Sequence, residues 1–262
     1  MSQELVRETK GGIATITINR PEQRNAMTYD MWQRLARYMA ELDPDPEVRV
    51  VILRGAGTQA FSAGADIAEF EEQRRNSTLA KKYHAAVDDA LESITHLPKP
   101  TIAMVAGFCV GGGLEIVTAT DLRIAADNSR FGIPPAKLGI FMPYREMSQL
   151  VRLVGSGQAM DMLLTARLVG AEEALRIGLV SRLVPVAEIE QYTYEVAAEI
   201  AGYAPLSHRW HKQVLEMVLS NPGLDGLTAE QADLPFACFD TEDFQEGRRA
   251  FMEKRKPEFK GR

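Results

Sequence analysis

The sequence predicts an α/β fold that ends in a helical region, and three observations support this prediction. Through residue 125, short apolar segments typical of buried strands alternate with amphipathic segments typical of helices. Such alternation favours mostly parallel strand pairing. After about residue 145 the pattern is almost wholly helical. The chain has 262 residues, of which 45% are hydrophobic, enough for one sizeable core, and no repeat or low-complexity linker interrupts it.

The first elements are predicted as strand, helix and strand. Residues 12–19 (GIATITIN) alternate β-branched with small or polar residues, as a half-buried strand does. Thr28 or Asp30 can cap a helix whose apolar residues recur at helical spacing. The proline-containing stretch 43–46 ends this helix, because proline lacks an amide hydrogen. Residues 48–53 (VRVVIL) are nearly all apolar, which predicts a strand in a sheet covered on both faces.

The next elements lead into a run of glycines. Residues 77–96 predict a long helix, which two prolines in the segment 97–100 end. Residues 101–106 (TIAMVA) predict a third buried strand, and the glycines at 111–113 follow it directly. Residues 122–125 predict one more short strand.

The rest of the chain is predicted as a series of helices. These cover residues 146–154, 156–165, 171–177, 186–203, 205–219, 228–238 and 241–254. The change of pattern suggests two units, a core over residues 1–195 and a helical C-terminal region over residues 196–262. We expect this region to pack on the core or on a neighbouring subunit.

Composition excludes several classes of protein. A formal net charge of −6 argues against a general nucleic-acid binder, although a local basic pocket for a phosphorylated small molecule remains open. The polar segment 1–10 and the lack of any apolar run near 20 residues predict a cytoplasmic protein without signal peptide or membrane span. Cys109 and Cys238 give neither a disulfide framework nor a metal-binding spacing.

The first informative turn lies in residues 60–70, which read AFSAGADIAEF. Small residues around Gly64 would let a ligand approach the main chain, and amides at the start of a helix point outward without partners. A simple turn with a helix cap at Asp66 is the alternative interpretation.

The second informative turn lies in residues 105–115, which read VAGFCVGGGLE. Glycine in a helix costs about 0.5–1 kcal/mol relative to alanine, which is easier to accept where a ligand must touch bare backbone. Tight packing of a helix against a sheet would also explain the glycines. Neither G-x-G-x-x-G nor a Walker A sequence is present, so nucleotide-phosphate binding of those types is not expected. We hypothesise that amides from both turns converge on one oxygen and form an oxyanion hole.

At these residues the chain resembles the enoyl-CoA hydratase/isomerase (crotonase) family, over about residues 13 to 261. Four ordered segments carry the resemblance: NRPEQRNAM (19–27), AFSAGADIAEF (60–70), KPTIAMVAGFCVGGGLEIVTATDLRIAA (99–126) and EDFQEGRRAFMEKRKPEFKG (242–261). The resemblance implies a crotonase-like spiral of ββα units and a helical C-terminal trimerisation region. It also implies a homotrimer, or a homohexamer built from two trimers.

The resemblance assigns roles to particular residues. The backbone amides of Ala65 and Gly112 would hold the oxygen of an acyl-CoA thioester. Contacts to coenzyme A would come from Arg24, Ala26, Ala63, Asp66 and Ile67. The basic segment 254–256 would lie near the coenzyme A phosphates. Coenzyme A would arrive as part of the substrate, so no separate cofactor and no metal are expected.

Acid/base chemistry is where the chain departs from its family. Hydratases of the family use two glutamates, and Glu115, three residues after Gly112, matches the first. Partial burial should raise its pKa, although a capping role without chemistry is the alternative. The second glutamate position holds Pro135, which cannot exchange a proton. Tyr144, or another of residues 144–146, could supply the absent acid, but a solvated loop would also explain them.

Three functions therefore stay open. The first is an enoyl-CoA hydratase-like lyase of fatty acid metabolism, which converts 2-enoyl-CoA to 3-hydroxyacyl-CoA. The second is a one-base enoyl-CoA isomerase or a methylmalonyl-CoA-type decarboxylase, because Pro135 replaces a carboxylate. The third is a catalytically weak acyl-CoA-binding scaffold subunit. His84 and His96 lie in a polar helix and are expected to be solvated.

Overall fold

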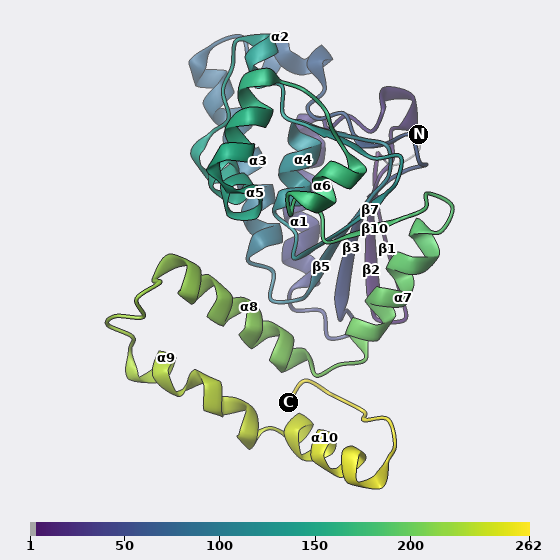
Figure 1. The fold of residues 1–262 in the computed structure, drawn as a ribbon, viewed down its shortest axis with the longest axis vertical. Coiled ribbons are helices and arrows are strands. Elements are labelled where there is room, and N and C mark those ends of the chain that lie inside the picture. Colours follow the sequence, from purple (N-terminus) through teal and green to yellow (C-terminus); the bar gives the residue numbers. More distant parts are fainter. Residues whose placement is uncertain (1–3) are drawn as a thin grey trace.

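The computed structural model describes residues 4–262 and is built around a twisted sheet. This sheet has the strand order β1 (Leu5–Lys10), β2 (Ile13–Ile18), β3 (Val50–Gly55), β5 (Thr101–Val105), β7 (Leu122–Ala126) and β10 (Arg182–Val184). Strand β1 pairs antiparallel with β2, and every other neighbouring pair in the sheet is parallel. The predicted parallel α/β arrangement is therefore confirmed, with an antiparallel strand at one edge (Figure 1).

A second, smaller sheet continues the strands of the first. Its order is β4 (Ala60–Ser62), β6 (Phe108–Val110), β8 (Arg130–Gly132) and β9 (Val169–Gly170). The chain passes from β3 to β4, from β5 to β6 and from β7 to β8, and a helix follows each pair. This repeated order of strand, strand and helix brings the ends of β4 and β6 side by side, because these two strands pair in parallel.

Both faces of the first sheet are covered. Val51 and Leu53 of β3 face one apolar cluster, which includes helices α1 (Tyr29–Leu42) and α3 (Ser77–Thr95). Val50 and Ile52 face the other cluster, which includes α7 (Ile189–Ala201). Alternate residues of a strand point to opposite faces, so an almost wholly apolar strand is what this burial requires.

The first two long helices begin at side-chain caps, of which Thr28 was expected from the sequence. The Thr28 hydroxyl accepts a hydrogen bond from the Met31 amide at 3.3 Å at the start of α1. The Asn76 side chain accepts from the Leu79 amide at 3.0 Å at the start of α3. Such caps satisfy amides that have no partner inside the helix.

The remaining helices follow strands of the second sheet or lie in the C-terminal part. They are α2 (Phe70–Gln73), α4 (Gly112–Thr118), α5 (Tyr144–Thr165), α6 (Ala171–Arg176), α8 (Pro205–Ser220), α9 (Ala229–Asp233) and α10 (Glu242–Glu253). Short 3₁₀ helices are η1 (Pro21–Gln23), η2 (Ile67–Glu69), η3 (Pro135–Leu138) and η4 (Leu234–Asp240).

Two helix predictions need correction. Residues 144–146 form the first turn of α5, so the helix predicted from residue 146 begins at Tyr144, and the alternative of a loop there was wrong. The α-helix predicted over residues 228–238 ends at Asp233 and continues as η4, because Pro235 lacks the amide hydrogen that an α-helix needs. Gly155 has φ 75° and ψ 162° and interrupts α5, as the predicted division between 154 and 156 required.

Helices α8, α9 and α10, with the tail to residue 262, extend away from the rest of the molecule (Figure 1). We name residues 205–262 the C-terminal arm. The predicted boundary after residue 195 falls inside α7, which packs on the first sheet, and the chain leaves this sheet after that helix. The division into two units stays a prediction. In the described part of the chain, no helix has the length and apolar character needed to cross a membrane.

The end of the arm folds back on α10 through two buried carboxylates. The Asp243 side chain accepts from the amides of Lys260 at 2.7 Å and Gly261 at 2.9 Å. Glu246 accepts from Arg255 at 2.6 Å, and the Arg255 and Arg249 side chains hold the pKa of Glu246 well below its usual range. The segment 242–261 thus contains the interactions that close its own turn.

Candidate active site

The site forms where segment 24–27 lies along segment 63–66. The Ala63 amide donates to the Arg24 carbonyl at 2.9 Å, and the Asp66 amide donates to the Met27 carbonyl at 2.8 Å. Asn25 holds this arrangement from inside, because its buried side-chain amide donates to the Ala60 carbonyl at 2.7 Å. The structure thus brings together the two segments that were predicted separately to contact coenzyme A.

The two glycine turns meet beside these segments. Gly64 has φ +96°, and a Cβ there would lie 2.8 Å from the Val110 carbonyl oxygen and 3.2 Å from the Gly112 nitrogen. A Cβ on Gly112 would lie 3.7 Å from the Ala65 nitrogen. Only glycine at position 64 permits both the left-handed backbone and this close approach. The turn after β4 and the turn after β6 are therefore in direct contact.

Two backbone amides in these turns are unpaired. Gly112 is the first residue of α4, so its amide has no partner inside the helix. Ala65 bridges to Met27, but the hydrogen bonds of that bridge use the Gly64 carbonyl and the Asp66 amide. Over residues 4–262, neither the Ala65 nor the Gly112 amide donates to a protein acceptor. These are the two amides to which the family resemblance assigned the thioester oxygen, and that role stays a prediction.

Tight packing also explains part of the glycine run. A Cβ on Gly113 would lie 2.7 Å from the Ser62 carbonyl oxygen, and a Cβ on Gly112 would lie 2.9 Å from the ring of Trp32. The indole of Trp32 is buried and donates to the Tyr83 hydroxyl at 3.0 Å, which fixes the ring against the turn. Glycines 112 and 113 thus serve the packing that was the alternative interpretation, while the Gly112 amide stays unpaired.

Glu115 lies in the first turn of α4, partly buried and close to the unpaired amides. Burial, then the negative charge of Glu146, raises the pKa of Glu115 from 4.5 to about 8, against the opposing charge of Arg74. The charge of Asp88 adds to the increase. The raised pKa expected for Glu115 is confirmed, and this carboxyl group is mostly protonated at neutral pH.

A second carboxyl group lies near Glu115, on a different helix. The Glu146 side chain on α5 is 1% exposed, and its Oε2 atom has no hydrogen-bond partner in residues 4–262. Burial raises the pKa of Glu146, while the charges of His84 and Arg145 lower it. The sequence offered Glu146 only as one of three neighbouring residues that could replace the missing acid. Its closeness to Glu115 follows from the packing of α5 on α4.

The sequence predicted a solvated His84, but the structure gives this side chain two charged neighbours. Its side chain is 38% exposed and lies between two carboxylates. The Nε2 atom is 3.2 Å from Asp88 Oδ2, and the Nδ1 atom is 3.8 Å from Glu146 Oε1. The Arg145 guanidinium contacts Asp88 from the other side at 3.2 Å.

The predicted auxiliary residue, Tyr144, is exposed at the start of a helix. Pro135 begins η3, so no side chain at this position can exchange a proton. Tyr144, the first residue of α5, is 93% exposed, and Phe141 nearby is 80% exposed. An auxiliary role for Tyr144 stays a prediction.

The other predicted coenzyme A contacts lie around the Gly64 turn. The Asp66 side chain accepts from the Ala68 amide at 3.0 Å, and so provides the predicted helix cap. It also pairs with Arg20 at 2.8 Å, while Ile67 is largely exposed. Ala26 is buried in the neighbouring segment. Their contacts with coenzyme A stay predictions.

These features define a class of protein: a two-sheet α/β fold in which two glycine turns present unpaired amides beside a protonated carboxyl group. Comparisons with known proteins give the family. The model of the enoyl-CoA hydratase/isomerase family matches residues 8–262. The chain belongs to the enoyl-CoA hydratase/isomerase family.

Individual relatives agree with this assignment. The chain is 39% identical over 259 residues to the short-chain-enoyl-CoA hydratase of Clostridium acetobutylicum, with 98% of each chain covered. It is 35% identical to the crotonyl-CoA hydratase of Syntrophomonas wolfei, again over 98% of each chain. A solved enoyl-CoA hydratase/carnithine racemase from Magnetospirillum magneticum superimposes with a TM-score of 0.95 at 38% identity. That comparison covers 100% of this chain and 97% of the other. The predicted crotonase-like fold is confirmed.

Proposed function

We propose that the chain adds water to 2-enoyl-CoA thioesters and forms 3-hydroxyacyl-CoA, the reaction of a lyase of the hydratase kind. The observation that carries this proposal is the pair of unpaired amides, at Ala65 and Gly112, beside Glu115. Family membership supports it, since two relatives are named as hydratases of short-chain and crotonyl thioesters.

In this proposal the thioester oxygen accepts hydrogen bonds from the amides of Ala65 and Gly112. When the oxygen of water bonds to C3, the electrons of the C2–C3 double bond move onto the thioester, and these amides stabilise the enolate. Loss of one such donor typically costs about 2.7–4 kcal/mol. Ionised Glu115 takes a proton from water and returns it to C2, so the enzyme regains its starting state without a separate cofactor.

Coenzyme A would lie along the paired segments 24–27 and 63–66. We propose that Arg24, Ala26, Ala63, Asp66 and Ile67 contact it, chiefly through main-chain groups. Arg24 and Ile67 are exposed and so accessible to a nucleotide. A homotrimeric or homohexameric assembly, a cytoplasmic location and a role in fatty acid metabolism belong to the same proposal.

One-base chemistry is the second candidate, because Pro135 carries no carboxyl group. Crotonyl-CoA, a 3-enoyl-CoA and methylmalonyl-CoA should therefore be assayed side by side. Hydration of crotonyl-CoA as the fastest reaction would support the proposal. Faster double-bond migration or decarboxylation would replace it with an isomerase or a decarboxylase. Binding of coenzyme A without turnover of any substrate would instead indicate a scaffold subunit.

Replacing Glu115 tests its role directly. We expect Glu115→Gln to lower kcat for crotonyl-CoA by a factor of about 10²–10⁴, the usual contribution of a positioned acid or base. The control is Glu172→Gln, at an exposed glutamate on α6 that should leave kcat unchanged. Equal kcat values for Glu115→Gln and the wild type would exclude Glu115 from the chemistry.

A further inference from the structure

Glu146 is a buried acid without an evident structural partner. It lies in the first turn of α5, is 1% exposed, and its Oε2 accepts no hydrogen bond in the described chain. A buried carboxylate oxygen without a donor is destabilising, so its presence requires an explanation. The nearby acid that feels its charge is Glu115, which comes from the neighbouring helix α4.

His84 connects Glu146 to solvent. Its ring is 38% exposed, its Nδ1 lies 3.8 Å from Glu146 Oε1, and its Nε2 lies 3.2 Å from Asp88 Oδ2. Since each nitrogen faces a different carboxylate, the ring can take a proton on one side and release one on the other. His84 therefore lies on the solvent side of Glu146, while Glu115 comes from the neighbouring helix α4.

We propose that His84 and Glu146 form a proton relay between solvent and Glu115, so that Glu146 supplies the second carboxyl group that Pro135 cannot provide. This inference rests on the proposed hydration. Glu146 acts as a positioning residue here, because its side chain is closed to solvent and it acts on the reaction through Glu115.

The relay supplies the ionised form of Glu115. Protonated Glu115 gives its proton to ionised Glu146, directly or through a hydrogen-bonded water, which leaves Glu115 able to accept a proton from the reacting water. Glu115 then delivers that proton to C2, and Glu146 returns the stored proton or passes it to His84. Each transfer moves one proton, and no electrons are exchanged with another reagent.

Charged groups from three elements face this pair. Glu115 is influenced by Glu146 of α5, by Asp88 of α3 and by Arg74, which follows α2. Glu146 is influenced by His84 and Asp88 of α3 and by Arg145 of its own helix. Removal of the Glu146 charge should therefore lower the pKa of Glu115 and move the pH dependence of kcat/KM to lower pH.

The first test compares Glu146→Gln with the control Asp89→Asn, a substitution at an exposed residue of α3. We expect Glu146→Gln to lower kcat for crotonyl-CoA by about 10²-fold. KM should be nearly unchanged, and the acidic limb of the pH profile should move to lower pH. Glu146→Asp, which keeps the charge, should recover part of the rate. A wild-type kcat with an unmoved pH profile in Glu146→Gln would overturn the relay.

A second test removes the solvent end of the relay. His84→Ala should lower kcat for hydration of crotonyl-CoA, most strongly at pH values where Glu115 is protonated, because only there must its proton be taken up. Added imidazole should restore the rate of this variant, since the position borders solvent. An unchanged kcat in His84→Ala across the pH range would contradict the relay.

The remaining outcomes separate the relay from the proposed function. If the wild type hydrates no thioester, the proposed function fails, but infrared titration of Glu115 in the free protein still tests its coupling to Glu146. An unchanged Glu115 titration in Glu146→Gln would then overturn the coupling too. His84, Asp88 and Glu146 can each place one ligand atom within 4.8 Å of the others. Activity that a chelator abolishes and Zn²⁺ restores would replace the relay with a metal site.

Discussion

Burial raises the pKa of two side chains, Glu115 and Glu146, to which we assign different roles. Burial is the largest contribution to the raised pKa of both side chains. Glu146 has the charges of His84 and Arg145 to favour its ionised form, whereas Glu115 has only Arg74 against two acidic neighbours. The two carboxyl groups therefore share a raised pKa but differ in the charges that surround them.

The raised pKa of Glu115 predicts a change of stability with pH. Between pH 4.5 and about 8 the folded protein keeps the Glu115 proton, while the unfolded chain releases it. Its contribution to stability is therefore complete below the unfolded pKa and is lost as pH rises through about 8. Relative to Glu115→Gln, the unfolding free energy of the wild type should fall with pH, by at most about 1.4 kcal/mol per unit.

Urea unfolding of both proteins at several pH values across this window measures the difference. Parallel dependence of the two unfolding free energies on pH would contradict the raised pKa. Asp89→Asn serves as the control, because the Asp89 side chain is exposed and its loss should leave the slope unchanged.

At the scale of single residues, spacing in the sequence was enough to predict one member of the site, Glu115. Glu115 could be predicted because it follows Gly112 on the same helix turn, and local spacing fixes such neighbours. Glu146 and His84 are 62 positions apart, so their approach depends on how α3 and α5 pack. No local pattern encodes that packing, which is why His84 was interpreted as solvated.

At the scale of elements, the break in α5 depends on one glycine. Gly155 has φ 75° and ψ 162°, a conformation that residues with a side chain rarely adopt. A Cβ there would meet nothing within 4 Å in the described part of the chain, so backbone strain alone should oppose substitution. We expect Gly155→Ala to destabilise the protein by about 1–3 kcal/mol.

Gly157, two residues later, provides the matched control. A Cβ on this residue would also meet nothing within 4 Å over residues 4–262, and its φ is not in the left-handed region. Gly157→Ala should therefore stabilise α5 by about 0.5–1 kcal/mol. Thermal or urea unfolding of both variants tests the pair, and equal effects would argue against strain at Gly155.

The elements that the sequence predicted well share length and strong periodicity. Helix α1 begins at the predicted cap Thr28, helix α3 begins at the predicted residue, and the apolar strands β3 and β5 lie close to where they were expected. Strand β1 was missed because it is an edge strand whose residues after Val6 are exposed and mostly polar. The strands of the second sheet have at most three residues each, too few for any period to appear.

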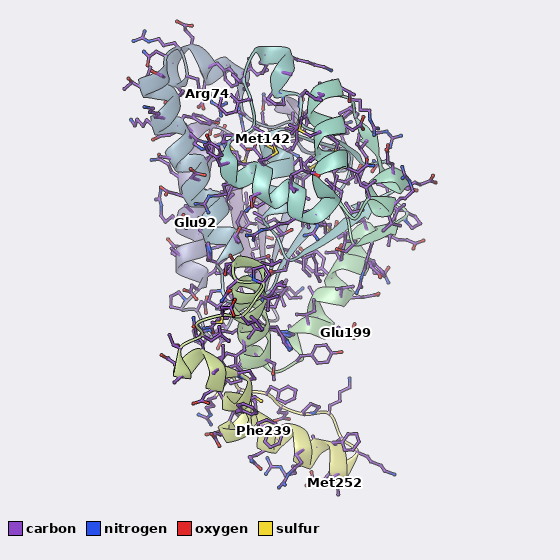
Figure 2. All side chains as sticks on the ribbon, turned by 60° about the vertical axis from the view of Figure 1, so that its left-hand side comes forward. Arg74, Glu92, Met142, Glu199, Phe239 and Met252 are labelled. Atoms are coloured by element: carbon purple, nitrogen blue, oxygen red, sulfur yellow. The ribbon has the colours of Figure 1, made fainter. Side chains whose placement is uncertain are left out.

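At the scale of the whole molecule, the C-terminal arm exposes more apolar surface than is usual for a monomeric folded protein. Exposed side chains on the arm include Leu215, Phe236, Phe239, Phe251 and Met252. Figure 2 shows Phe239 and Met252 on the arm, away from the sheets. Polar contacts such as Lys212 with Asp121, at 2.8 Å, join α8 to the core but leave these side chains uncovered.

The proposed homotrimer or homohexamer would cover this surface. Phe251 is 82% exposed in the single chain, and burial of such an aromatic side chain in an interface often contributes about 2 kcal/mol or more. We expect Phe251→Asp to shift the protein toward monomers at micromolar concentration, as measured by sedimentation velocity. Thr78→Asp, an equal charge change at an exposed position of α3, should leave the assembly intact. A monomeric wild type would contradict the proposed assembly.

The two tryptophans lie in different parts of this molecule. Trp32 is buried against the Gly112 turn, and Trp210 lies on α8 of the arm. Indole emission depends on the immediate surroundings of the ring, so the protein carries one indole beside the proposed thioester site and another in the arm that we propose to lie in the subunit interface. Variants that keep a single indole would separate the optical signal of ligand entry from that of subunit association.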